Sequence, residues 1–145
     1  MRFMVLMIPG DKSYEAGAMP DAGLLDAMMK YNEELAKAGV ILAGDGLHPS
    51  SKGARIKFAA GGKKTVTDGP FTEARELIGG YWLWQVKSKA EAMEWASRCP
   101  AMDGDMLEIR QVFEPSDFGP DIARKEAELL EIAKRNAEKT KQTAP

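Results

Sequence analysis

Residues 68–84 constrain the fold most, because they combine a tight turn, a short charged segment and the most apolar strand candidate in the chain. Asp68, Gly69 and Pro70 are typical turn residues, since Asp bonds nearby backbone groups, Gly accepts a positive φ and Pro fixes its own φ. From Leu77 to Val86, apolar residues occupy both alternating sets of positions. A strand that is apolar on both faces is buried on both faces, so this segment is predicted to be a central strand.

Two glycines stand near the start of this strand, and three aromatic residues follow them. Gly79 and Gly80 indicate either a β-bulge or the close approach of another backbone or a ligand. Tyr81, Trp82 and Trp84 are interpreted as core residues, with a ligand-binding wall as the alternative.

Periodicity and turn residues place the other elements around this strand. Leu24, Met28, Tyr31 and Leu35 repeat at helical spacing, and Ser88-x-x-Glu91 is a capping box. The predicted strands are Arg2–Ile8, Val40–Ala43, Arg55–Ala59, Lys64–Thr67, Leu77–Val86 and Met106–Phe113, and the predicted helices are Asp21–Ala38, one starting at Ser88, and Asp121–Lys141. This order is a split β-α-β repeat with an inserted hairpin, an α+β fold in which the first strand and the Leu77–Val86 strand are central. Two helices cover one face of such a sheet, so a second cover is predicted for the other face.

Composition excludes several classes of protein. The chain has 145 residues, a net charge of −2 and one cysteine, Cys99. One domain is expected, with no intrachain disulfide and no electrostatic basis for binding nucleic acid or an anionic membrane. The apolar run at Phe3–Ile8 is too short for a signal peptide or a membrane span, so a cytoplasmic protein is expected.

Three motifs stand in a fixed order: AGDGLHPS at residues 43–50, DGPFTEARE with GGYW at residues 68–82, and EAMEWA at residues 91–96. Together they resemble the YCII-related family of small bacterial proteins, in its DGPF-domain subgroup. The resemblance covers roughly residues 1–114 and implies a ferredoxin-like fold that dimerises through its sheet, of the dimeric α/β-barrel type. It implies no settled activity. Residues 115–145 lie outside it and are predicted to form a connector and an amphipathic helix.

His48 and Asp68 are the candidate catalytic residues. His48 follows Asp45 by three residues in a loop shaped by Gly and Pro, where a carboxylate beside a histidine suits a general base. The alternative is a loop histidine with no role in chemistry. Asp68 is the signature acid of the resembling family; it either caps its turn or supplies an acid at the rim of the sheet. Relatives with a proposed His-Asp pair carry their histidine near the start of the first helix, and residues 21–26 contain none.

The predicted pocket has Asp68, Gly79, Gly80 and Tyr81 as its boundary, and Asp45, His48 and Glu76 at its rim. Tyr14 and Glu15 lie in a preceding loop with no evident role. No metal-ligand spacing, Walker A motif or G-x-G-x-x-G motif occurs, so neither metal nor cofactor is expected. Cys99 is interpreted as structural, since it lies on a buried helix stripe.

Two functions from different classes fit these features. The first is a homodimer that binds a small molecule between its sheets, with cofactor-free acid/base catalysis as its chemistry. The second is a non-catalytic regulatory or interaction module, because DGPF relatives are often encoded beside sigma factors and the C-terminal helix offers an interaction surface.

Overall fold

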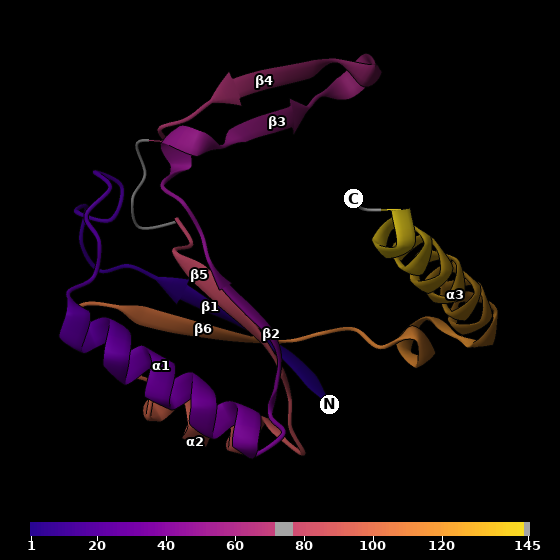
Figure 1. Ribbon diagram of the computed structural model, residues 1–145. Coiled ribbons are helices and arrows are strands. Elements are labelled where there is room, and N and C mark those ends of the chain that lie inside the picture. The colour runs from indigo at the N-terminus through magenta and orange to yellow at the C-terminus, as the bar shows by residue number, and fades with distance from the viewer. Residues whose placement is uncertain (72–76, 144–145) are drawn as a thin grey trace. The chain divides into compact units, whose positions relative to one another are not determined.

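The structure is a computed structural model that describes residues 1–71 and 77–143 (Figure 1). The chain divides into two units, Met1–Val112 and Phe113–Pro145, which are described separately. The strands are β1 (Arg2–Ile8), β2 (Ile41–Gly46), β3 (Ala54–Phe58), β4 (Lys64–Asp68), β5 (Gly80–Gln85) and β6 (Met106–Gln111). The helices are α1 (Ala22–Lys37), α2 (Lys89–Ser97) and α3 (Pro120–Thr143), and the short 3-10 turns are η1 (Ser50–Lys52), η2 (Ala60–Gly62) and η4 (Pro115–Phe118).

Four strands form an antiparallel sheet in the order β2-β5-β1-β6. This is the strand order of a ferredoxin-like split β-α-β fold, as predicted. β1 and β5 occupy the centre, which confirms the inference from their two apolar faces. β5 is shorter than the predicted Leu77–Val86 strand, because its ladder with β1 begins only at the Met7–Gly80 pair.

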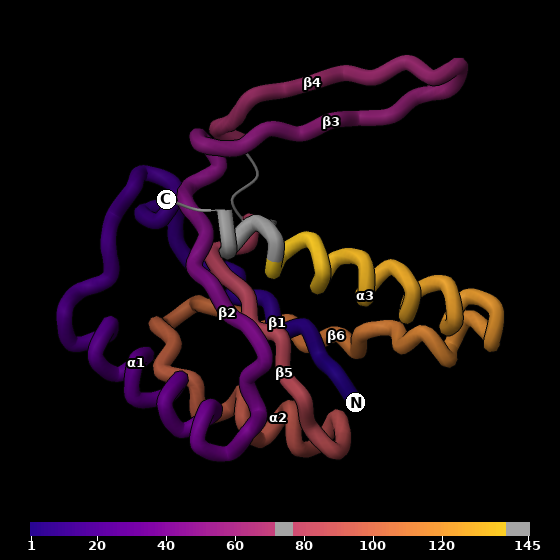
Figure 2. The backbone as a smooth tube through the Cα atoms, turned by 45° about the vertical axis from the view of Figure 1, so that its right-hand side comes forward, coloured from indigo at the N-terminus to yellow at the C-terminus, as the bar shows by residue number. Residues whose placement is uncertain are grey.

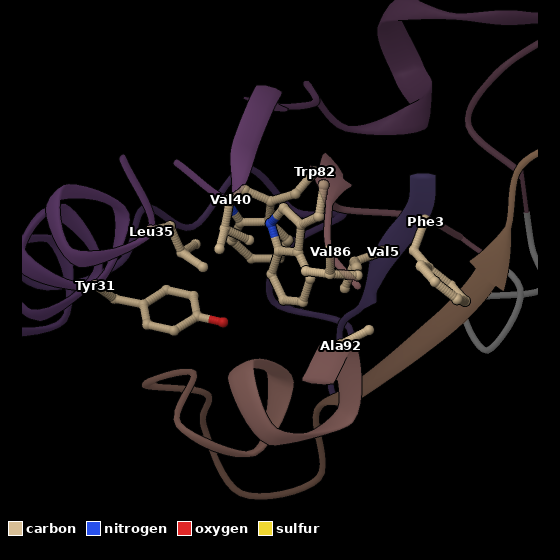
Figure 3. Packing of buried hydrophobic residues seen from close by; sticks show 9 residues of the cluster. Phe3, Val5, Tyr31, Leu35, Val40, Trp82, Val86 and Ala92 are labelled. Atoms are coloured by element: carbon tan, nitrogen blue, oxygen red, sulfur yellow. The ribbon is translucent and has the colours of Figure 1, made fainter. Parts of the chain in front are cut away.

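The core lies between the four-stranded sheet and the two helices α1 and α2, which cover the same face (Figure 1). Phe3 and Val5 point from the sheet into this layer, and Leu35 from α1 and Ala92 from α2 meet them (Figure 3). Trp84 of β5 belongs to the same buried cluster. The core interpretation of the aromatic residues is thus confirmed for Trp82 and Trp84, while Tyr81 is half-buried.

Both helices of this unit begin at side chains that accept a backbone hydrogen bond. Asp21 Oδ1 accepts from Leu24 N at 2.8 Å, and Ser88 Oγ accepts from Glu91 N at 3.1 Å. Glu91 completes the predicted box in a shifted form, because its carboxylate accepts from Lys87 N, one residue before the cap. These bonds satisfy free N–H groups of the first turns.

The opposite face of the four-stranded sheet is apolar at its centre. Met4, Leu6 and Ile8 of β1 and Leu83 of β5 alternate with the core residues and are half-buried. Neither α1 nor α2 lies on this face (Figure 1). The predicted second cover, a sister subunit, therefore stays a prediction.

β3 and β4 form the predicted hairpin as a separate two-stranded sheet (Figure 2). Its base closes where Gly69 N donates to Gly53 O at 2.9 Å. At the tip, Gly61 and Gly62 have φ of 72° and 74°, a region that glycine enters without steric cost. The Gly61-Gly62 turn signal was therefore correct.

The second unit consists of η4 and α3. The Phe113 and Phe118 rings pack with centroids 5.1 Å apart, and Glu114 N donates to Asp117 Oδ2 at 2.7 Å before the helix begins. The predicted stripe on α3 is present, with Ile122, Leu129 and Leu130 all exposed. That residues 1–114 fold without this helix stays a prediction. Over the described residues, no helix is long and apolar enough to cross a membrane.

Candidate functional site

A cavity of about 270 Å³ lies between α1 and one end of the four-stranded sheet. Its wall is mainly apolar and comes from β1, β2, β5, α1 and the loops that follow β1 and α2. The lining residues are Met7, Pro9, Tyr14, Pro20, Leu24, Leu25, Met28, Asn32, Gly44, Asp45, Gly46, Gly79, Gly80, Tyr81, Trp82, Pro100, Met102 and Asp105.

Glycines on the helix-facing side of the sheet create this space. Gly46 pairs with Gly80, and Gly44 pairs with Trp82, so these residues share the face on which Trp82 packs against α1. A Cβ built on Gly46 meets no atom within 4 Å. At Gly46 and Gly80 the sheet thus provides backbone without side chains, while Leu24 and Met28 of α1 line the cavity as well.

The close approach predicted at Gly79 and Gly80 is present. A Cβ on Gly79 would lie 2.8 Å from Pro9 Cγ, and a Cβ on Gly80 would lie 3.0 Å from Asp45 O. The only register shift between β2 and β5 falls elsewhere, between Ile41 and Ala43. The glycines therefore serve close packing and leave room for the cavity. On the β1 side, Gly79 N donates to Met7 O at 2.8 Å although Met7 pairs with Gly80, so both glycines lie opposite Met7, as in the predicted bulge.

Asn32 is the principal polar group on the α1 side of the cavity. Its Oδ1 accepts from Trp82 Nε1 at 2.9 Å, which fixes the orientation of the amide. The Asn32 Nδ2 group has no acceptor among the described residues, and Asn32 lines the cavity.

Tyr14 holds the loop after β1 against the end of the sheet. Its hydroxyl donates to Leu47 O and lies 3.2 Å from Gly79 O. Burial raises the pKa of Tyr14, and the charge of Glu15 raises it further. At neutral pH the phenol is therefore a neutral hydrogen-bond donor at the cavity wall.

Two carboxylates fasten the loops around the cavity. Glu15 accepts from Ser50 N at 3.0 Å and from the Ser50 hydroxyl, and Ser50 Oγ in turn accepts from Phe71 N at 2.9 Å. Asp105 accepts from Gly10 N and from Met102 N, each at 2.9 Å. Both acids are thus engaged by the backbone and organise loops.

The structure brings together four of the predicted site residues. Asp45, Gly79, Gly80 and Tyr81 all line the cavity. Tyr81 Oη donates to Asp45 Oδ2 at 3.0 Å, and this hydrogen bond, with the charge of Asp45, raises the pKa of Tyr81.

Asp68 and His48 are not among the described residues that line the cavity. Asp68 ends β4 opposite Ala54, and His48 is exposed in the segment after β2. Glu76 lies outside the described residues. The cavity lies within one chain, on the helix-facing side of the sheet, so it is distinct from the predicted site between two sheets. The roles of Asp68, His48 and Glu76 stay predictions.

A metal site and a reactive thiol each set requirements for the described residues. It contains no group of three or more His, Cys, Asp or Glu residues that could hold a metal ion. Burial raises the pKa of Cys99 to about 11, and the charge of Asp105 contributes to the shift. The thiol is therefore protonated at neutral pH and weakly nucleophilic, in keeping with the structural role predicted for it.

Comparisons with known proteins identify a family and a similar solved structure. The structure is 5-chloro-2-hydroxyhydroquinone dehydrochlorinase (TftG) from Burkholderia phenoliruptrix AC1100, in complex with 2,5-dihydroxybenzoquinone. It is 14% identical, its match covers 83% of this chain and 100% of that chain, and the TM-score is 0.41. No curated protein matches the chain. The YCII-related domain matches residues 1–116, and the chain belongs to that family.

Proposed function

We propose that this protein binds a small, mainly apolar molecule in the cavity beneath α1. The observation that carries the proposal is the pairing of Gly46 with Gly80 on the helix-facing side of the sheet, which leaves an apolar space inside the fold. Ligand sites are typically concave, mainly apolar and equipped with a few polar groups that fix orientation. This cavity has those properties.

The polar groups on the wall favour a neutral ligand with a hydrogen-bond acceptor. Asp105 already accepts two backbone hydrogen bonds, and Asp45 accepts from Tyr81, so the wall acids are engaged. Asn32 Nδ2 is the available donor. Typical ligand pockets measure roughly 300–1,000 Å³, so a cavity of about 270 Å³ suits a molecule the size of one substituted ring.

We also propose that the protein is a homodimer. The centre of the sheet face opposite α1 and α2 is apolar, at Leu6 and Leu83 among others. A second subunit would remove this surface from water, and two-fold dimers are the commonest assemblies. Light scattering at micromolar concentration is expected to give twice the chain mass; a monomer mass would contradict the dimer.

Filling the cavity at Gly46 is expected to weaken ligand binding without harming the fold. The Cβ of Gly46→Val enters open space, so the added methyl groups occupy ligand volume. p-Cresol and 4-methylcyclohexanone serve as single-ring probes, with Trp82 on the cavity wall as the fluorescent reporter. We expect Gly46→Val to weaken probe binding at least about tenfold, the loss of roughly 1.4 kcal/mol of binding free energy.

The matched control is Thr65→Val, which adds a β-branched apolar side chain to the exposed strand β4. It should bind both probes as the wild type does. Equal probe affinity for wild type and Gly46→Val, with both proteins folded, would show that the cavity is not the site.

Cofactor-free acid/base catalysis by Asp68 and His48 is a separate part of the proposal. Neither lines the cavity, so Asp68→Asn and His48→Gln should leave p-cresol affinity within about twofold and stability within about 0.5 kcal/mol. Asn retains turn-forming ability but lacks the carboxylate base. Loss of turnover, for a compound that the wild type converts, would assign the catalytic role; full turnover in both variants would remove it.

A regulatory or interaction module is the second candidate, and α3 is the observation that favours it. Ile122, Leu129 and Leu130 are exposed on a helix that lies beyond the YCII-related match. Failure of both probes to bind the wild type would favour this candidate over the cavity.

A further inference from the structure

The hairpin β3–β4 and its base, residues 52–68, form an arm with a solvent-exposed apolar surface. Every residue of its two strands is exposed. Ile56 is 55% exposed, Phe58 72% and Val66 64%. Exposed apolar residues that gather on one element indicate an interaction surface.

The strand register places different kinds of side chain on the two faces of the arm. Ile56 pairs with Val66, and Phe58 pairs with Lys64, so three apolar side chains share one face. Arg55 and Lys57 alternate with them and share the other face with Thr65 and Thr67. The arm therefore has an apolar face and a basic face.

Among the described residues, the contacts that hold the arm to the rest of the chain lie at its base. Gly69 N donates to Gly53 O, and the Arg55 guanidinium lies 4.0 Å from the centre of the Phe71 ring. Toward the tip, the Lys64 ammonium lies 5.6 Å from the centre of the Phe58 ring, a contact within the arm itself. An isolated two-stranded hairpin is at best marginally stable in water, so a cover on the apolar face would stabilise it.

Charge identifies a suitable partner. Residues 52–68 contain five basic residues and one acidic residue, a net charge of +4. Because the whole chain carries −2, the remainder carries −6. Two arms would repel each other, whereas an arm and the remainder of another copy attract.

We propose that the arm is an intermolecular contact that lies, apolar face inward, on a second copy of this chain. The proposal rests on the homodimer proposed above and adds the element that holds it together. A polyanion such as single-stranded nucleic acid would meet the basic face and leave Phe58 and its neighbours exposed. A second copy offers the apolar face a matching surface around Leu6 and Leu83, and its charge of −6 outside the arm attracts the basic arm as a whole.

Excision of the arm is the first test. Ala54 and Asp68 are paired at the base, so Arg55–Thr67 can be replaced by Asn-Gly, a two-residue hairpin turn. Light scattering and sedimentation at about ten micromolar should show a dimer for the wild type and a monomer for the excised form, with the weakening of association at least about tenfold, as for loss of an interface hot spot. Unchanged p-cresol binding would show that the excised protein retains its fold.

Point variants test each face without changing the backbone. Ile56→Thr with Phe58→Thr removes apolar contact, and Lys57→Glu reverses a charge; each should weaken the dimer. Thr67→Ser is the control for the double variant, because Thr67 lies on the face opposite Ile56 and Phe58, and it should leave the dimer intact. The effect of Lys57→Glu should shrink at high salt, since screening weakens interactions between exposed charges.

The outcomes distinguish failure of the proposed arm contact from failure of the proposed homodimer. A wild type that is dimeric and stays so after excision overturns the arm contact and leaves the dimer. A monomeric wild type overturns both, and salt-dependent binding of a single-stranded oligonucleotide to that monomer would identify the polyanion as the partner. Probe binding in the cavity is measured separately and is independent of these results.

Discussion

Trp84→Ala is expected to remove about 3–5 kcal/mol of folding free energy, as substitutions of a buried Trp by Ala do. Trp84 is 0% exposed and lies on the central strand β5, where it pairs with Phe3 of β1 and Ile41 of β2. Its ring also packs at 6.2 Å from that of Trp82. Domains of this size are stable by only about 5–15 kcal/mol, so one substitution removes a large share.

Urea unfolding, followed by circular dichroism, measures this loss. Trp95→Ala is the matched control, because Trp95 is only half-buried and packs under the Arg98 guanidinium at 3.7 Å from its ring centre. Trp95→Ala should lower the free energy of unfolding clearly less than Trp84→Ala does. Equal losses at the two positions would contradict the central place of Trp84 in the core.

Trp84→Phe refines the same prediction. Trp84 Nε1 is buried and finds no hydrogen-bond partner among the described residues. A buried donor without a partner costs free energy, so phenylalanine gains by removing it while losing some packing volume. We therefore expect Trp84→Phe to cost less than half as much as Trp84→Ala.

The fold was accessible from the sequence because its signals are local. The two central strands were identified from apolar residues on both faces, α1 from the helical spacing of Leu24, Met28, Tyr31 and Leu35, and the start of α2 from the capping residue Ser88. The start of β5 was placed too early. Leu77 is buried, as expected of a strand residue, yet the ladder pairs begin at Gly80. The apolar alternation of a sequence shows which residues are buried, but it does not show whether a buried residue such as Leu77 also pairs with a neighbouring strand.

The cavity was only partly accessible, because it depends on register. Gly79 and Gly80 indicated a close approach, but the pairing of Gly46 with Gly80 follows from how β2 aligns with β5. Tyr14 showed no role in the sequence, since its hydroxyl bonds carbonyls 33 and 65 residues away. Asn32 was missed for the same reason, because its partner Trp82 is distant in sequence.

Gly44→Ala is expected to destabilise the protein by about 1–3 kcal/mol, the usual cost of overpacking a well-filled core. A Cβ at Gly44 would lie 2.7 Å from Trp82 Cδ1 and 3.2 Å from Tyr81 O. The indole cannot move freely, since Asn32 holds its Nε1 and Tyr31 packs edge-on against it. Gly46→Ala, two residues along β2, is the matched control, because its Cβ meets nothing within 4 Å.

A double-mutant cycle shows whether the Trp82 ring causes that loss. Trp82→Leu removes the ring atom that the new methyl group would strike, although it also destabilises the protein by itself. In the Trp82→Leu background, Gly44→Ala should therefore cost clearly less than in the wild type, and the difference between the two costs is the coupling energy, expected at about 0.5–3 kcal/mol for residues in contact. Both backgrounds are measured by urea unfolding. Additive costs would assign the loss to the backbone contact at Tyr81 O, and a Gly44→Ala protein as stable as Gly46→Ala would contradict the tight packing that bounds the cavity on this side.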